Sequence, residues 1–198
     1  NRTLEVSSYK MQTSDHHTEF DSTQSHLAII IPAIKRDDPE YHDILVANYI
    51  FGGSGFGSWL MEEIREKRGL SYSVYSYLAS NRNEGYIKIS LQTKNENLSL
   101  AKEIITEQLN RLEKFDVTEE EVTTVKKSIL RSFEMKTDTN KKILNLVSAI
   151  NYLNLDLNYF ENYKAKLDKV SKSTIKDALI NSVDFSNISI LSVGKTIE

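Results

Sequence analysis

Apolar residues recur along the chain with two different periods, which separate strand-like from helix-like segments. Short runs rich in β-branched and aromatic residues, bounded by turn residues, indicate strands. Such runs predict strands at Thr3 to Tyr9, His26 to Ile31, Tyr72 to Ala79, Tyr86 to Gln92 and Ile188 to Val193. Pro32 is expected to end the second strand. The third and fourth flank a polar turn and predict a β-hairpin, with Ile87, Ile89 and Leu91 on one face.

Apolar residues spaced three or four positions apart predict helices elsewhere. Asp38 is expected to cap a helix whose first residue is Pro39, and a second helix runs from about Ser58 to Gly69, the residue expected to terminate it. Two amphipathic helices follow from Leu98, the second after a capping box at Thr118 and Glu121. Shorter helices are predicted at Ile143 to Leu153, Tyr159 to Leu167 and Thr174 to Val183.

Strands and helices therefore occur in blocks, without strict alternation, which predicts the α+β class. The chain of 198 residues contains no Ser/Gly/Pro-rich linker and no low-complexity tract, so we expect a single domain over residues 1–198.

Net charge, apolar run length and cysteine content indicate which kinds of partner and site to expect. The net charge is −3, and lysines alternate with acidic residues along the second half, so no basic face suited to nucleic acid is expected. The longest apolar run, Leu27 to Ile31, is far shorter than the ~20 residues that cross a bilayer, so we expect no membrane insertion. Cysteine is absent, which excludes disulfides and thiolate metal sites but leaves the compartment open. The chain begins at Asn1, and we expect a processed product or a segment of a longer protein.

The sequence does not match the familiar motifs for phosphate binding, zinc binding or a serine nucleophile. The glycine cluster Gly52, Gly53, Gly55 and Gly57 follows a helix pattern and lacks the Lys-Ser/Thr of a phosphate-binding loop, so we expect a flexible helix-to-helix connection. His16-His17-Thr18-Glu19-Phe20 approaches the inverted zinc motif His-x-x-Glu-His, but Phe20 replaces the second histidine. These histidines are expected in a surface loop, with no metal bound by this chain. No Gly-x-Ser-x-Gly elbow joins a strand to a helix, so a serine nucleophile is unsupported.

One stretch, Phe51 to Tyr75, resembles the second, non-metal-binding domain of the pitrilysin, insulinase and mitochondrial processing peptidase family. Its glycine-rich turn leads to Ile64-Arg-Glu-Lys-Arg-Gly-Leu-Ser-Tyr72, a long ungapped match, and the resemblance extends loosely over nearly the whole chain. Trp59 stands where the family usually has Arg, and Gly57 where Ser or Thr is common. The larger departure is the missing His-x-x-Glu-His, which in the family belongs to the first domain or to a partner subunit.

The resemblance implies an antiparallel or mixed β-sheet flanked by helices, of the LuxS and processing-peptidase metallohydrolase type. It also implies the non-catalytic half of a zinc metalloendopeptidase, with two such halves enclosing extended or unfolded peptide. Zinc would lie in the partner half, and this half alone would be inactive. An Arg/Tyr pair of the family, seven residues apart, falls on Arg65 and Tyr72, which implies that they bind the substrate backbone.

Two alternatives remain at this point. Without the resemblance, Arg65 would merely complement a helix C-terminus and Tyr72 merely open a strand. At the level of the protein, the alternative is a non-catalytic scaffold subunit of the respiratory core-subunit type. The bacterial relatives that the chain resembles are often exported, which favours the periplasm over the cytoplasm.

Overall fold

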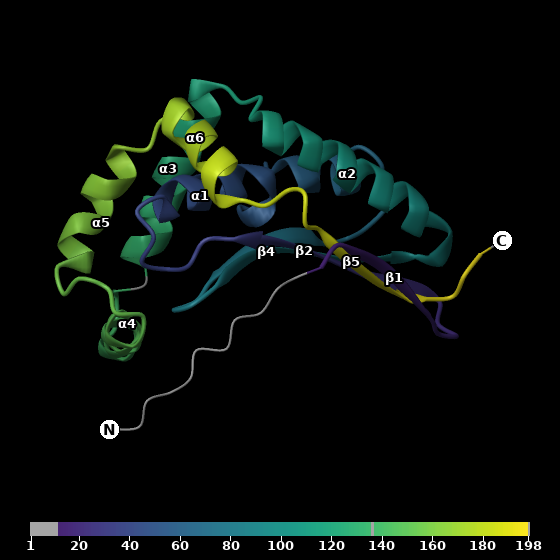
Figure 1. Ribbon diagram of the computed structural model, residues 1–198, viewed down its shortest axis with the longest axis horizontal. Coiled ribbons are helices and arrows are strands. Elements are labelled where there is room, and N and C mark those ends of the chain that lie inside the picture. The colour runs from purple at the N-terminus through teal and green to yellow at the C-terminus, as the bar shows by residue number, and fades with distance from the viewer. Residues whose placement is uncertain (1–11, 136, 198) are drawn as a thin grey trace.

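The computed structural model describes residues 12–135 and 137–197, in which five strands form one sheet with helices packed on one of its faces (Figure 1). The strands are β1 (Ser14–Glu19), β2 (Gln24–Ala33), β3 (Val74–Ser80), β4 (Gly85–Lys94) and β5 (Ser189–Gly194). Their order is β1-β5-β2-β4-β3, with β1 parallel to β5 and the other neighbours antiparallel. The predicted α+β class with a mixed sheet is confirmed.

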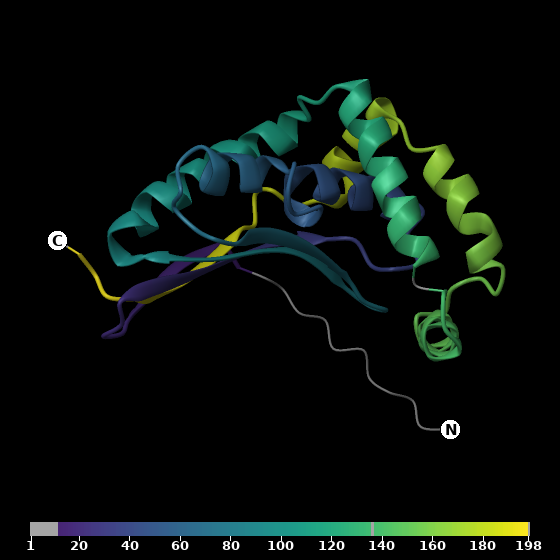
Figure 2. The same cartoon turned by 180° about the vertical axis from the view of Figure 1, so that it is seen from behind.

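The helices lie almost entirely over one face of this sheet. They are α1 (Tyr41–Asn48), α2 (Leu98–Lys114), α3 (Glu119–Glu134), α4 (Asn140–Tyr152), α5 (Tyr159–Asp168) and α6 (Lys172–Ser182), with two π-helical segments, η1 (Tyr49–Gly53) and η2 (Met61–Glu66), and the 3₁₀ turn η3 (Asn95–Asn97). Helix α4 lies apart, past the end of the sheet, and buries only Ile150 (Figure 2). The second face of the sheet carries no described helix, and we call it the open face.

Period-two alternation decides which strand residues face the helices. Leu27, Ile29 and Ile31 of β2 are buried against them, and their cross-strand partners in β4 are Leu91, Ile89 and Ile87. Burying each of these side chains stabilises the fold by roughly 1.5–3 kcal/mol. The helix layer supplies the matching apolar stripe, for which Ile105, Leu109 and Leu112 of α2 are examples. The face predicted for residues 87, 89 and 91 is confirmed.

Helix starts follow their capping signals closely. The Thr118 side chain accepts a hydrogen bond from the Glu121 amide at 3.2 Å, and the Glu121 carboxylate accepts one from the Thr118 amide at 2.7 Å. The predicted capping box of α3 is therefore confirmed. The first helix begins at Tyr41, two residues after Pro39, because the Asp38 carboxylate accepts from the Glu40 amide at 2.9 Å and forms a turn before the helix.

The end of β2 and the start of β3 differ from expectation. Pro32 does not end β2 but pairs with Tyr86. Its carbonyl accepts from the Asp184 amide at 3.0 Å, so its nitrogen faces the side where β5 has already ended and no ladder bond is lost. Strand β3 begins at Val74, not Tyr72. The predicted strand from Thr3 to Tyr9 lies outside the described residues.

Strand β1 was not predicted, because the segment around His16 and His17 is too polar to show apolar alternation. The histidines lie in this edge strand and not in a loop. An edge strand beside β5 buries little surface, so polar residues suffice for its pairing. Adjacent strand residues point to opposite faces, so the two imidazoles cannot bind one ion together.

The glycine cluster is divided between packed and open positions. Gly52 and Gly53 complete η1 instead of starting a loop. A Cβ atom added to Gly52 would lie 2.8 Å from Leu60 Cδ1, 2.8 Å from Ser76 Oγ and 3.0 Å from the Ser76 nitrogen. The Gly52 backbone therefore packs directly against Ser76 of β3 and the Leu60 side chain. The connection proper is shorter than expected and starts at Ser54; its mobility stays a prediction.

His42 is a buried titratable residue of the helix layer. Its side chain is buried, with its ring edge-on to Tyr41 and Tyr163 at centroid distances of 5.2 Å each. Its Nε2 atom has no hydrogen-bond partner in the described part of the chain. Burial, with smaller contributions from Arg36 and Lys166, lowers the pKa of His42 to about 4. The ring is therefore neutral in the folded protein at neutral pH.

Acid should destabilise the fold through His42. Between the unfolded pKa of about 6.5 and the folded value of about 4, only the unfolded chain is protonated, so stability is lost as the pH falls through this window. We expect a loss of about 2 kcal/mol near pH 5 relative to neutral pH. Denaturant unfolding across this range should show a smaller loss for His42→Phe, whereas His16→Phe, an exposed control, should keep the wild-type slope. An unchanged slope in His42→Phe would contradict the assignment.

Gly52→Ala should destabilise the protein, because its methyl group meets Leu60 and Ser76 with no space to yield. We expect a cost of roughly 1–3 kcal/mol in the free energy of unfolding. Ser54→Ala is the control, since Ser54 follows η1 directly and its side chain makes no hydrogen bond with the described residues. Equal melting temperatures for Gly52→Ala and Ser54→Ala would show that η1 and β3 are not in tight contact.

Candidate functional site

The turn between η1 and η2 presents an aromatic side chain to solvent. Gly55 and Gly57 have φ angles of +74° and +85°, and a Cβ atom at either would meet nothing within 4 Å. These left-handed conformations favour glycine for backbone reasons alone. The Ser58 hydroxyl closes the turn by donating to the Gly55 carbonyl at 2.7 Å. Phe56, between the two glycines, is left 70% exposed.

Arg65 lies in η2, directly beside this turn. Its guanidinium carbon is 4.7 Å from the centroid of the Phe56 ring, a cation–π contact that orients the side chain. Its neighbours Lys67 and Arg68 are tied to Glu62 and Glu63 by ion pairs. Arg65 makes no ion pair or side-chain hydrogen bond within residues 12–135 and 137–197, so its donors remain available. Long π-helical segments such as η2 are rare and often accompany functional sites.

Tyr72 follows a chain reversal at Gly69, whose φ is +61° as the predicted helix end requires. The segment after it is fixed to β4, because the Thr93 hydroxyl donates to the Leu70 carbonyl at 2.6 Å and the Ser71 hydroxyl to the Gln92 carbonyl at 2.7 Å. Tyr72 itself projects outward and is 90% exposed. A residue with a fixed backbone and an exposed side chain is suited to binding a ligand or another chain.

The structure places Arg65 and Tyr72 on either side of one turn, but it does not bring them into contact. No hydrogen bond or ring contact joins the two side chains in the part of the chain described. Their joint action on a substrate therefore stays a prediction. The prediction that Tyr72 opens the strand is wrong, because Tyr72 precedes β3. Phe56, whose ring contacts the Arg65 guanidinium, was not predicted as a site residue.

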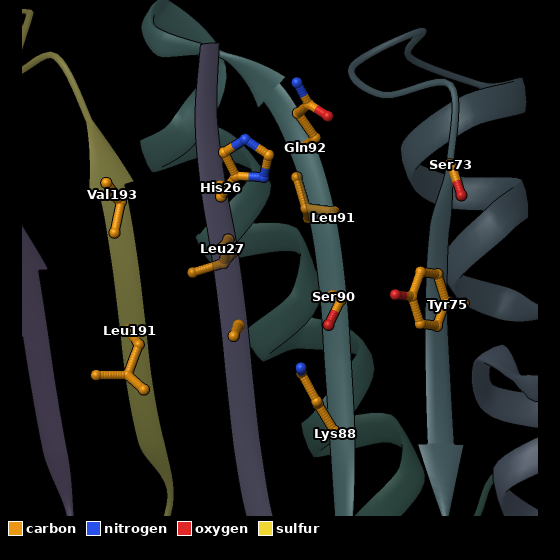
Figure 3. A pocket seen from close by; sticks show the side chains of 11 residues that line it. His26, Leu27, Ser73, Tyr75, Lys88, Ser90, Leu91, Gln92, Leu191 and Val193 are labelled. Atoms are coloured by element: carbon orange, nitrogen blue, oxygen red, sulfur yellow. The ribbon is translucent and has the colours of Figure 1, made fainter. Parts of the chain in front are cut away.

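A pocket of about 450 Å³ lies on the open face, next to the segment that carries Tyr72 (Figure 3). Ala28 and Ser90, cross-strand neighbours with small side chains, form its floor. Larger side chains surround them: Tyr75 from β3, Lys88 and Gln92 from β4, His26 from β2, and Leu191 and Val193 from β5. Ser73 also lines it, one residue after Tyr72. Sequence reasoning passed over this pocket, although it follows from alternation, since residues 88, 90 and 92 must oppose 87, 89 and 91.

His17, the second histidine of the sequence His16-His17, contacts side chains of β5 and of its own strand. His17 Nδ1 lies 3.0 Å from the Ser192 hydroxyl, and Nε2 lies 3.8 Å from the Glu19 carboxylate. Hydrogen bonds from Thr196 lower the pKa of Glu19. Across residues 12–135 and 137–197, no group of three or more His, Asp or Glu side chains is placed to hold a metal ion. No helix there has the length and apolar character needed to span a lipid bilayer.

Comparison with known proteins agrees with this architecture. Residues 3–129 match the family model of the peptidase M16 inactive domain. The non-peptidase homolog YmxG of Helicobacter pylori is 32% identical over 155 residues, which cover 73% of this chain and 34% of that protein. An uncharacterized zinc protease YmxG of Bacillus subtilis is 30% identical over 139 residues, covering 67% of this chain and 34% of that protein.

The same relation holds in three dimensions. The crystal structure of the peptidase M16 inactive domain from Pseudomonas fluorescens superposes with a TM-score of 0.87 at 32% sequence identity, covering 94% of this chain and 44% of that chain. The chain thus spans about a third of the length of the curated relatives it matches. Its glycine turn, Arg65 and Tyr72 all lie within the matched residues. The chain belongs to the peptidase M16 family, as the inactive domain of that family.

Proposed function

We propose that this domain is the substrate-holding half of a zinc metalloendopeptidase, which encloses an extended peptide together with a metal-bearing half. The observation that carries the proposal is the uncovered, hollowed sheet face beside a firmly anchored segment whose Tyr72 points into solvent. A sheet face that carries apolar side chains is normally covered by helices or by a partner. Tyr75, Tyr77, Leu191 and Val193 are 40–62% exposed on this face.

The proposed division of labour assigns zinc to the other half. When bound there, zinc would supply an activated water for attack on the peptide carbonyl. This half would hold the backbone of the substrate. The Arg65 guanidinium and the Tyr72 hydroxyl are donors, one always charged and one neutral, and both suit the negative charge that develops on a carbonyl oxygen. Phe56 would keep the Arg65 side chain extended toward the substrate.

A second function is favoured by a different observation. The Helicobacter pylori relative is named a non-peptidase homolog, so the same fold occurs without assigned peptidase activity. In that case the domain would be a binding or scaffold subunit, and Arg65 and Tyr72 would have no catalytic role. The two functions make opposite predictions for substitutions at these residues.

Arg65→Ala and Tyr72→Phe should each lower turnover when the metal-bearing half is supplied, in the same chain or as a separate subunit. Loss of one donor to a developing oxyanion costs on the order of 10²–10³ in kcat, or ~3–4 kcal/mol. The assay is hydrolysis of a quenched peptide, with melting temperatures measured in parallel. Arg82→Ala in the hairpin turn and Tyr152→Phe at the end of α4 are matched controls on exposed sites. Near-full turnover in both folded variants would favour the scaffold function.

The purified domain alone should contain well under one zinc ion per chain. The reason is geometric, since His16 and His17 point to opposite faces of β1 and have no third ligand in the described residues. Elemental analysis of the tag-free protein checks this. One zinc retained per chain, and released on replacing His17 with Ala, would contradict the assignment of the metal to the other half.

A further inference from the structure

Charge on the open face is distributed unevenly. The residues of the five strands that point to this face include Lys88, Lys94, His16 and His26 but no Asp or Glu. The chain as a whole carries 28 acidic residues and a net charge of −3. The two carboxylates of β1, Asp15 and Glu19, face the opposite way. The ion pair between Asp15 and Lys102 of α2, at 2.9 Å, confirms that Asp15 faces the helices.

The pocket on this face gathers hydrogen-bond donors that have no partner among the residues that the structure describes. Tyr75 and Ser90 are cross-strand neighbours, and Lys88 lies on the same side of β4, two residues before Ser90. Figure 3 shows the Tyr75 hydroxyl and the Lys88 ammonium directed toward Ser90 from two sides. None of these three groups makes a hydrogen bond or ion pair with the described residues. Lys94, by contrast, is paired with Glu96 at 3.5 Å.

The opposite wall of the pocket is apolar. Leu191 and Val193 of β5 remain 42% and 40% exposed there. A ligand that fits both walls has an aliphatic stem and an anionic end, because the stem can cover the leucine and valine while the end accepts from the three donors. A glutamate side chain of an extended peptide has this form. Two lysines are too few to neutralise the phosphates of a nucleic-acid site.

We propose that the open face selects acidic peptide segments, with a glutamate or aspartate carboxylate held in the pocket by Lys88, Tyr75 and Ser90. This inference rests on the proposed function and gives it a substrate class. A basic peptide would be disfavoured, since it meets Lys88 and no compensating carboxylate.

The test uses the full chain labelled with ¹⁵N and three extended peptides of equal length that differ only in carrying Glu, Gln or Lys at their central positions. Titration into the millimolar range follows the amides of Ala28 and Ser90. We expect the Glu peptide to bind about threefold to fivefold more tightly than the Gln peptide, and the Lys peptide more weakly than either. High salt should remove the difference, because it screens exposed charges.

Lys88→Met removes the charge but keeps the aliphatic stem, so it should abolish the preference for Glu over Gln. Lys127→Met, on the exposed side of α3, is the matched control and should retain it. Lys88→Glu should reverse the order in favour of the Lys peptide. Equal binding of all three peptides would overturn the acidic selectivity while leaving peptide binding intact. Absence of binding by all three to the folded chain, or tighter binding of a single-stranded oligonucleotide, would overturn the proposed function as well.

Discussion

The architecture depends on the one-sided burial of the central strands. Leu27, Ile29 and Ile31 of β2 and their partners in β4 all point to the helices, and the pleat sends every other residue to the opposite face. A shift of pairing by one residue would expose the whole apolar set. The same constraint that fixes the core therefore fixes the open face. Ala28, Ser90 and Lys88 occupy their positions because their neighbours are held in the core.

The helix layer reaches this sheet through an unusually close contact. At Gly52 the end of η1 meets Ser76 of β3 without an intervening side chain. Asn48, buried in α1, faces the same strand: its side-chain amide lies 3.5 Å from the Ser76 carbonyl, and the Ser76 hydroxyl donates to the Asn48 carbonyl at 3.3 Å. These contacts fix where the glycine turn emerges, and with it the place of Phe56 and Arg65. Gly52 and Gly53, which are packed, thus position the candidate site. Gly55 and Gly57, which have free space around them, allow the turn that carries Phe56.

Most of the fold could be predicted from the sequence, and the exceptions share a cause. Elements with a strong apolar period, such as α2, α3 and β4, were found within a few residues, because burial of their own face determines them. Strand β1 was missed because its pairing with β5 is supplied by backbone hydrogen bonds from a segment about 175 residues away. The residues at 52 and 53 were placed in a loop because glycine usually marks one. Here it marks a close approach of the glycine backbone to Leu60, Ser76 and Asn48, which no single-sequence pattern distinguishes.

The position of β5 has a consequence for how the chain folds. Only residues 20–23 separate β1 from β2 along the chain, yet β5 lies between them in the sheet. In the finished sheet β1 and β2 do not pair with each other, and the position between them is filled only when residues 189–194 are available. Completing the sheet therefore requires contacts of very large sequence separation, which are slow to form because loop-closure entropy must be overcome first. During synthesis the hairpin of β3 and β4 can form early, whereas the β2 edge remains exposed until nearly the whole domain has left the ribosome. That interval is when the growing chain is most open to strand pairing with other chains.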